Sequence, residues 1–225
     1  MSAAVAVRSA AREVGVVWLG LVALGTGFGV VVTGYGFPWW LAPLISLTVF
    51  AGSVEFILVG MLAGGASIAA IALTTFVVNS RHLFYGLTFP LHRVEGRLPR
   101  AYSVFALIDE AYALTAGKDP AMLSSGRILA TQAGLHLSWV GGSLLGALAG
   151  SLLGDVEGLD FVLTALFVVL ALDAYDERPD RVTLLLATGA AGLAFLVAPG
   201  SMVLVAMSVF AATLLIRHRR GRQHA

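Results

Sequence analysis

The chain has 225 residues, of which 58% are hydrophobic and only 12% are charged, and its formal net charge is +1. Soluble domains carry about 25% charged residues, so this composition excludes an ordinary soluble protein and indicates a lipid-embedded one. The small net charge gives no indication of nucleic-acid binding, and the lack of cysteine excludes disulfides and thiolate ligands.

The apolar content is enough for several membrane crossings. A hydrocarbon core about 30 Å thick needs roughly 20 helical residues per crossing. We therefore predict an all-α fold, a polytopic membrane helix bundle of about seven spans (range six to eight), forming a single integral membrane transport domain over residues 1–225. The expected apolar runs lie at Val14–Tyr35, Trp39–Leu62, Ala66–Val78, Ile128–Gly154, Phe161–Tyr175, Val182–Val197 and Met202–Ile216.

Charges near the two ends of the chain bear on its topology. The first apolar run is too long for the core of a signal peptide, so we expect a retained helix. Arg8 and Arg12 before it, and the basic tail at 217–225, favour cytoplasmic ends.

The segment Ala101–Gly117 is short and polar, and is either a half-helix, a re-entrant segment or a tight crossing. A crossing there gives eight spans but puts the arginine-rich loop His92–Arg100 outside, so we favour a half-helix or a segment that does not cross.

Two of the apolar runs contain polar or small residues where a helix can stop. Ala51-Gly52-Ser53 lies in the second run, and a break there would free backbone groups to bind a ligand; a continuous helix is the alternative. The third run leads into Asn79-Ser80-Arg81-His82. Either one helix continues and buries Arg81, which then needs a partner, or the helix ends at Asn79 with Arg81 at the interface.

A weak internal similarity is also present. Gly20–Leu44 aligns without a gap with Gly142–Leu166, and the matched pairs include Gly20 with Gly142 and Gly36 with Gly158. Duplicated halves are common in transporters, so the alignment is compatible with an internal repeat; chance matching within apolar sequence is the alternative.

Four blocks of sequence carry a resemblance to a known family. They are AGSVEFILVGML, VVNSRHLFYG, LIDEAYAL and GLDFVLTALFVVLALD, in this order. Together they resemble the AzlC family, the large subunits of branched-chain amino acid exporters. The resemblance implies a secondary exporter of valine, leucine and isoleucine, with methionine as a further candidate. It also implies a small hydrophobic AzlD-type partner subunit and the inner (cytoplasmic) membrane of a prokaryote.

Four polar residues within the apolar runs and their flanks are the candidate substrate-binding residues: Glu55, Asn79, Arg81 and Asp109. An amino-acid zwitterion needs a cation for its carboxylate, which suits Arg81, and an acceptor for its ammonium, which suits Glu55 or Asp109. The family usually has Gln at position 55. The acid found here is therefore the candidate proton-coupling residue, with a structural Glu55–Arg81 pair as the alternative.

Other classes of function find little support in the sequence. The chain has no HExxH, GxSxG or Walker motif, and its histidines and acids are scattered, so we expect neither an enzyme nor a metal or cofactor. Two alternatives to a transporter stay open: a structural or assembly subunit without its own transport pathway, and an intramembrane enzyme acting on lipid.

Overall fold

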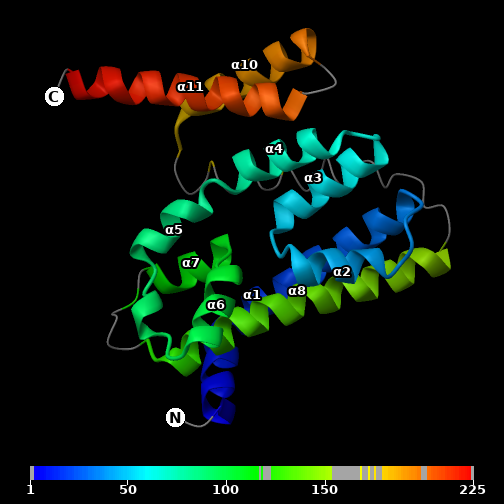
Figure 1. The fold of residues 1–225 in the computed structure, drawn as a ribbon, viewed down its shortest axis with the longest axis vertical. Helices are drawn as coiled ribbons and strands as arrows, with labels where there is room; N and C mark the ends of the chain where they lie inside the picture. The colour runs from blue at the N-terminus through cyan, green and yellow to red at the C-terminus, as the bar shows by residue number, and fades with distance from the viewer. Residues whose placement is uncertain are drawn as a thin grey trace. The chain divides into compact units, whose positions relative to one another are not determined.

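The structure is a computed structural model, and it describes residues 3–116, 118, 123–153, 168, 172, 175, 179–198 and 202–223. Every regular element in this part of the chain is a helix, which confirms the all-α prediction. The chain divides into two compact units, residues 1–64 with 79–163 and residues 65–78 with 164–225, which are described in turn (Figure 1). The prediction of a single transport domain stays a prediction.

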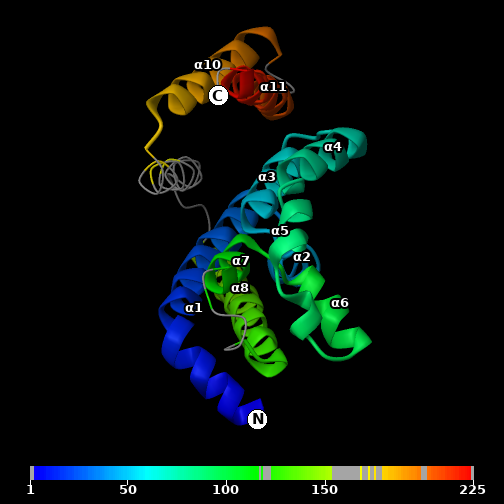
Figure 2. The ribbon, with the colours of Figure 1, turned by 90° about the vertical axis from the view of Figure 1, so that its left-hand side faces the viewer.

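The first unit is organised around two long helices that lie side by side (Figures 1 and 2). The expected spans Val14–Tyr35 and Ile128–Gly154 correspond to these helices, both of which begin earlier than predicted; α1 ends at Gly34, and α8 is described up to Leu153. Shorter helices pack against this pair or link the helices that do. The elements are α1 (Ala3–Gly34), α2 (Leu41–Thr48), α3 (Gly52–Ala63), α5 (His82–Thr88), the 3₁₀ helix η1 (Leu91–Arg93), α6 (Arg97–Phe105), α7 (Asp109–Ala116) and α8 (Ser125–Leu153).

Glycines allow the backbones of α1 and α8 to approach each other closely. A Cβ atom on Gly25 would lie 2.6 Å from the carbonyl oxygen of Trp139, and one on Gly29 would overlap Ser143 and Ala147. In the opposite direction, Gly142 lies against the backbone of Val22, and Gly146 lies against Thr26. Residue numbers rise together along both helices, so α1 and α8 run parallel. Both carry the GxxxG spacing that is typical of tightly packed membrane helices.

These reciprocal contacts bear on the predicted internal repeat. The packing makes Gly25 and Gly29 the counterparts of Gly142 and Gly146. The sequence alignment instead pairs Gly142 with Gly20, where an added Cβ would meet no atom. Contacts across a helix pair do not fix which positions of two repeats correspond, so the internal repeat stays a prediction. Much of the second aligned segment lies outside the described residues.

Both predicted interruptions of apolar helices are present. The second run forms α2 and α3, with Val49–Ala51 between them, so the break predicted near Ala51-Gly52-Ser53 is confirmed two residues earlier. The third run ends as a helix at Asn79, and α5 begins at His82. The interpretation in which one helix continues through Arg81 is therefore wrong, and the one in which the helix ends at Asn79 is confirmed.

The segment between His92 and Gly117 differs in part from the prediction. The expected loop His92–Arg100 is partly helical, because η1 covers its start and α6 begins at Arg97. Gly96, with a φ of 90°, turns the chain into α6, and Pro99 is tolerated in the first turn, where its missing N–H has no partner in the helix. The chain is interrupted again at Ala106–Ile108 before α7. Helices α6 and α7 are each about 12–14 Å long, too short to cross a bilayer, which favours the half-helix interpretation.

The second unit contains α4 (Ile68–Asn79, up to residue 78), α10 (Arg181–Val197) and α11 (Met202–Gln223). The expected spans Val182–Val197 and Met202–Ile216 are thus helical, and α11 continues through most of the basic tail. The expected span Phe161–Tyr175 lies outside the described residues apart from single positions.

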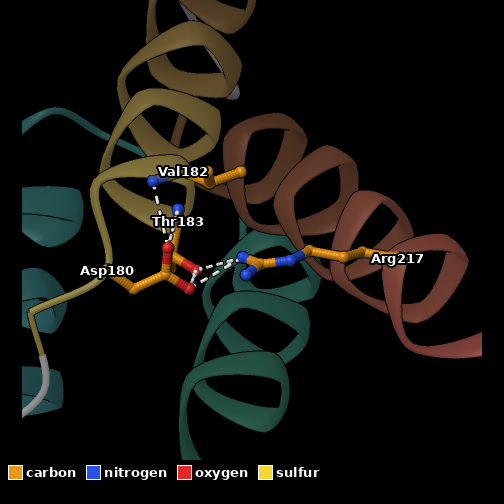
Figure 3. A network of polar contacts seen from close by, with 4 residues as sticks. All are labelled: Asp180, Val182, Thr183 and Arg217. Carbon is orange, nitrogen blue, oxygen red and sulfur yellow. Dashed lines mark hydrogen bonds and ion pairs between the residues drawn. The ribbon is translucent and has the colours of Figure 1, made fainter. Parts of the chain in front are cut away.

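A polar network joins the start of α10 to α11 (Figure 3). Asp180 caps α10: it accepts hydrogen bonds from the backbone N–H groups of Val182 and Thr183, at 3.0 and 3.2 Å. Its other oxygen lies 2.7 Å from the Thr183 hydroxyl and 2.8 Å from the Arg217 guanidinium. Asp180 therefore ties together the two helices of this hairpin.

Helix length bears on the predicted number of spans. Among the described residues, Val7–Gly34 and Ser125–Leu152 are long and apolar enough to cross a membrane unaided. Shorter apolar helices cover Gly52–Ala63, Arg181–Val197 and Val205–Arg217. The total of about seven crossings stays a prediction.

Candidate functional site

One face of α8 carries polar side chains toward the interrupted helices. Gln132, His136 and Trp139 follow one another at the i, i+4, i+7 spacing, which places them on the same side of the helix. All are at least nine-tenths buried in the protein. Gln132 contacts the end of α6, while Trp139 contacts the start of α3. This face of α8 therefore connects two helix interruptions that lie far apart in the sequence.

Glu55 is fully buried at the start of α3 and is held by hydrogen-bond donors. The hydroxyl of Ser46 donates to one carboxylate oxygen at 2.8 Å, and the backbone N–H of Ala51 donates to the other at 3.0 Å. The indole N–H of Trp139 lies 2.9 and 3.0 Å from the two oxygens. These four residues are called the Glu55 cluster below. They satisfy the acid without any cation, so Glu55 is not paired with Arg81.

The backbone around this interruption explains how the cluster forms. Phe50 has a φ of 44°, an uncommon conformation for a residue with a side chain, and its ring is buried beside the His136 ring with a centroid distance of 4.4 Å. Such a strained residue persists only where the surroundings fix it, and packing on α8 supplies that here. At Gly52 a Cβ would come within 3.3 Å of the Trp139 ring. A small residue at this position therefore lets the indole reach Glu55.

The second group of charges forms around Asp109 at the start of α7. Arg81 pairs with Asp109 at 2.7 Å and also donates to the Ser53 hydroxyl at 3.3 Å. The Tyr85 hydroxyl donates to Asp109 at 2.7 Å, and His82 lies 3.6 Å from the same oxygen. The side chains of Arg81 and Asp109 are 45% and 41% exposed, so this group remains accessible. The residues Ser53, Arg81, His82, Tyr85 and Asp109 are called the Asp109 cluster below.

The structure thus brings together two of the four residues predicted for the site. Arg81 and Asp109 form an ion pair, whereas Glu55 lies in its own cluster. The two clusters are linked through Ser53, which binds Arg81 and precedes Glu55 by two positions in α3. Asn79 ends α4, and its side-chain oxygen is buried without a hydrogen-bond partner.

The sequence patterns did not predict five of the polar residues near these interruptions: Ser46, Ser103, Gln132, His136 and Trp139. Three of them, Gln132, His136 and Trp139, share a signal in the sequence. Their spacing places polar groups on a single face of an otherwise apolar helix. Ser46 and Ser103 gave no such signal, because serine is common in membrane helices. The residues that the structure describes contain no group of three or more His, Cys, Asp or Glu that could hold a metal ion.

Comparison with known proteins places this site within a family. Residues 16–153 match the family described as AzlC protein, a range that includes both clusters. The chain is 31% identical over 177 residues to the branched-chain amino acid transport protein AzlC of Bacillus subtilis, covering 77% of this chain and 69% of that protein.

Other relatives are described as membrane proteins. The chain is 32% identical over 168 residues to one from Helicobacter pylori, covering 72% of this chain and 73% of the relative. It is 29% identical over 164 residues to the inner membrane protein YgaZ of Escherichia coli, covering 67% and 66% of the two chains. No solved structure matches the chain significantly.

Proposed function

This chain belongs to the AzlC family of membrane transport proteins, and on that premise we propose that it is a secondary transporter that exports branched-chain amino acids. Valine, leucine and isoleucine are the proposed substrates, with methionine as a further candidate. The name of the Bacillus subtilis relative supports the substrate class, and the name of the Escherichia coli relative supports the inner membrane as the location.

The observation that carries this proposal is the pair of interrupted helices beside α8. The α2–α3 and α6–α7 interruptions each place backbone groups and buried polar side chains next to one membrane-length helix. Transporters use broken helices in this way, because the free backbone groups at a break can bind a polar substrate inside an apolar protein. An assembly subunit would not need a buried acid at such a break, since packing alone would suffice.

The Asp109 cluster is the proposed site for the carboxylate end of the substrate. Arg81 is partly exposed and bound on one side by Asp109, so it can turn a second pair of donors toward a carboxylate. Asn79, two residues earlier, has a buried side-chain oxygen without a partner and is proposed to contact the substrate as well. In this arrangement Asp109 orients Arg81.

We further propose that Glu55 couples transport to proton movement. The Trp139 indole and the Ala51 amide can only donate hydrogen bonds, but the Ser46 hydroxyl can donate or accept. When Glu55 is protonated, its O–H can donate a hydrogen bond to the Ser46 oxygen once the Ser46 hydroxyl has turned, and the other donors need not move. The cluster thus accommodates both protonation states with one rotation.

A small hydrophobic AzlD-type subunit is proposed as a partner, by the family resemblance. Many large apolar side chains of the described helices are exposed, among them Val16, Leu19 and Leu152. Such surfaces suit lipid or another membrane helix equally. Efflux is measured with this chain expressed alone and together with such a subunit. Full efflux by the chain alone would count against the partner.

The proposed function is tested by efflux. Cells lacking other exporters are loaded with a panel of labelled amino acids, and loss of label is followed with and without this chain. Faster loss of leucine, isoleucine and valine than of alanine or lysine supports the proposal. Equal loss of all amino acids, with the chain present in the membrane and its proposed partner co-expressed, favours the assembly subunit instead.

A further inference from the structure

We propose that α6 lies in the headgroup layer at the cytoplasmic surface of the membrane and is held there by anionic phospholipid. Helix α6 packs on α8 with one face and leaves another face exposed. Binding of lipid at the exposed face would not depend on which substrate the chain transports.

The two faces of α6 differ in chemistry. On the inner face Ser103 is fully buried, and its carbonyl oxygen accepts a hydrogen bond from Gln132 of α8 at 2.9 Å. Leu98, Ala101 and Val104 follow one another at the i, i+3, i+6 spacing and lie on the opposite side of the helix. Leu98 is 84% exposed and Val104 is 55% exposed. An exposed apolar face on a short helix of a membrane protein fits the boundary between headgroups and acyl chains.

Two arginines accompany this apolar face. Arg97 precedes Ala101 by one turn and Val104 by two, so it lies on the same side of α6, and Arg93 in η1 is exposed just before it. Among the described residues, neither guanidinium group has an ion pair or a hydrogen bond. Guanidinium groups bind phosphate oxygens and apolar side chains contact acyl chains, so the pattern matches the surface of an anionic lipid layer.

The contacts of this segment place it at the end of the first unit where α1 and α8 begin. The backbone N–H of Glu95 donates to the Ser125 hydroxyl at 3.1 Å, which sets the turn before α6 beside the start of α8. Lys118 and Arg127 both pair with Glu13, near the start of α1. In both views the start of α1, helix α6 and the start of α8 lie at the lower end of this unit (Figures 1 and 2).

Positive charge is concentrated at this end. Arg8 and Arg12 lie near the start of α1, and the sequence contains no lysine or arginine between Arg12 and Arg81. Lysine and arginine are enriched on the cytoplasmic side of membrane proteins, and anionic lipids of that surface attract them. The geometry therefore assigns this end to the cytoplasm. It puts the arginine-rich segment 92–100 on the same side as the start of α1, which the sequence left open.

The depth of α6 can be measured with spin labels. The chain contains no cysteine, so Leu98→Cys and Val104→Cys each provide a single attachment site on an exposed side chain. The full chain is placed in vesicles of phosphatidylcholine with and without phosphatidylglycerol. Accessibility of each label to oxygen and to a water-soluble nickel chelate then reports its depth. Leu152→Cys is the matched control, because Leu152 is 86% exposed but lies at the far end of α8.

We expect the labels at positions 98 and 104 to lie at headgroup depth and to lose contact with the nickel chelate when phosphatidylglycerol is added. The label at position 152 should not respond to this lipid. Labels that remain in the oxygen-rich acyl core, or in water with either lipid, would overturn the proposal. Shielding that appears only when a small hydrophobic subunit is co-expressed would also overturn it, because the face would then be a subunit contact.

The arginines are tested by binding of lipid. The full chain in detergent is titrated with phosphatidylglycerol and with phosphatidylcholine, and bound lipid is counted by native mass spectrometry. Arg93→Gln together with Arg97→Gln should weaken phosphatidylglycerol binding by about five-fold for each arginine and leave phosphatidylcholine binding unchanged. Arg181→Gln, an exposed cation at the start of α10, is the control. Equal affinity of the double variant and the unchanged chain, or an equal loss in the control, would overturn the proposal.

Two further measurements separate a lipid surface from the alternatives. Glycerol phosphate carries the anionic phosphate without acyl chains and should not displace phosphatidylglycerol; displacement at similar concentration would show a site for free phosphate instead. A membrane-impermeant maleimide should label Arg97→Cys in inside-out vesicles and not in intact cells. Labelling in intact cells would put this end of the unit outside and overturn the proposal.

Discussion

The indole N–H of Trp139 lies 2.9 and 3.0 Å from the two carboxylate oxygens of Glu55, so a donor from α8 holds the buried acid at the start of α3. The two residues are 84 positions apart in the sequence. This contact fixes the interrupted helix onto the membrane-length helix that the rest of the first unit packs around.

Replacing Trp139 by Phe should reveal the strength of this contact. The substitution keeps an aromatic ring beside Phe28 and Phe56 but removes the N–H, and loss of a hydrogen bond to a buried carboxylate costs about 1–3 kcal/mol. Trp18→Phe is the control, because the Trp18 N–H is buried without a partner. Unfolding measured by heat or by SDS titration should show a loss for Trp139→Phe only. Equal losses would mean that ring size, not the hydrogen bond, matters.

The parallel pair α1 and α8 gives a second prediction. A methyl group on Gly29 would overlap the backbone of Ser143 and Ala147, and backbone cannot turn aside as a side chain can. Gly29→Ala should therefore force the helices apart and destabilise the protein by about 1–3 kcal/mol or more. Gly27→Ala, where the added group meets no atom within 4 Å, should leave stability unchanged or slightly raise it. Thermal melting in detergent tests both, and similar melting of the two variants would contradict the packing described.

Sequence patterns anticipated the helix boundaries better than the contacts between helices. The break near Gly52 and the end of α4 at Asn79 were predictable, because small and polar residues interrupt apolar runs there. The start of α6 at Arg97 was missed, because a string of charged residues resembles a loop and the capping effect of Gly96 depends on its positive φ.

The composition of the site could be predicted only in part. Glu55, Arg81 and Asp109 were found because charges are rare in apolar runs, but their partners were not. Arg81 pairs with Asp109 rather than with Glu55, and the sequence gives no distance between segments that meet only in the fold. Gln132 and His136 were visible as a helical face on α8, but their role depends on the end of α6, which lies more than 25 residues away.

The cap of α10 leads to a prediction about pH. Hydrogen bonds from the Thr183 side chain and from Arg217 lower the pKa of Asp180 from 3.8 to about 2. Because the folded pKa is the lower one, the ionised cap stabilises the hairpin above pH 3.8, and this contribution is lost as the pH falls toward 2. Arg217→Gln should raise the Asp180 pKa, which carboxyl carbon NMR would follow. The substitution should lower the melting temperature less at pH 2 than at pH 6. Arg181→Gln is the control, and an equal pKa change in it would contradict a specific pair.

The Arg81–Asp109 pair can be tested for a role beyond structure. Arg81→Gln should abolish efflux while changing stability by less than about 1 kcal/mol, since partly exposed ion pairs contribute little. The exchanged pair, Arg81→Asp with Asp109→Arg, restores a salt bridge but removes the cation from its position. Efflux and the amount of protein in the membrane are measured for both. Normal efflux by Arg81→Gln, or full recovery in the exchanged pair, would show that the cation does not bind substrate.

Glu55→Gln discriminates proton coupling from a purely structural role for the buried acid. The structure predicts that this variant folds, because the amide oxygen can still accept from Ala51 and Trp139 and the amide nitrogen can donate to the Ser46 oxygen. The variant cannot bind and release a proton, so net efflux should lose its dependence on pH, while exchange of labelled for unlabelled leucine should continue. Glu95→Gln, an exposed acid outside both clusters, should keep the pH dependence of the unchanged chain. Efflux is measured at a series of external pH values together with the melting temperature of each variant. If the Glu55→Gln protein folds and its efflux keeps the pH dependence of the unchanged chain, coupling through Glu55 is ruled out. If that protein also has a lower melting temperature, the role of the acid is to hold α3 against α8.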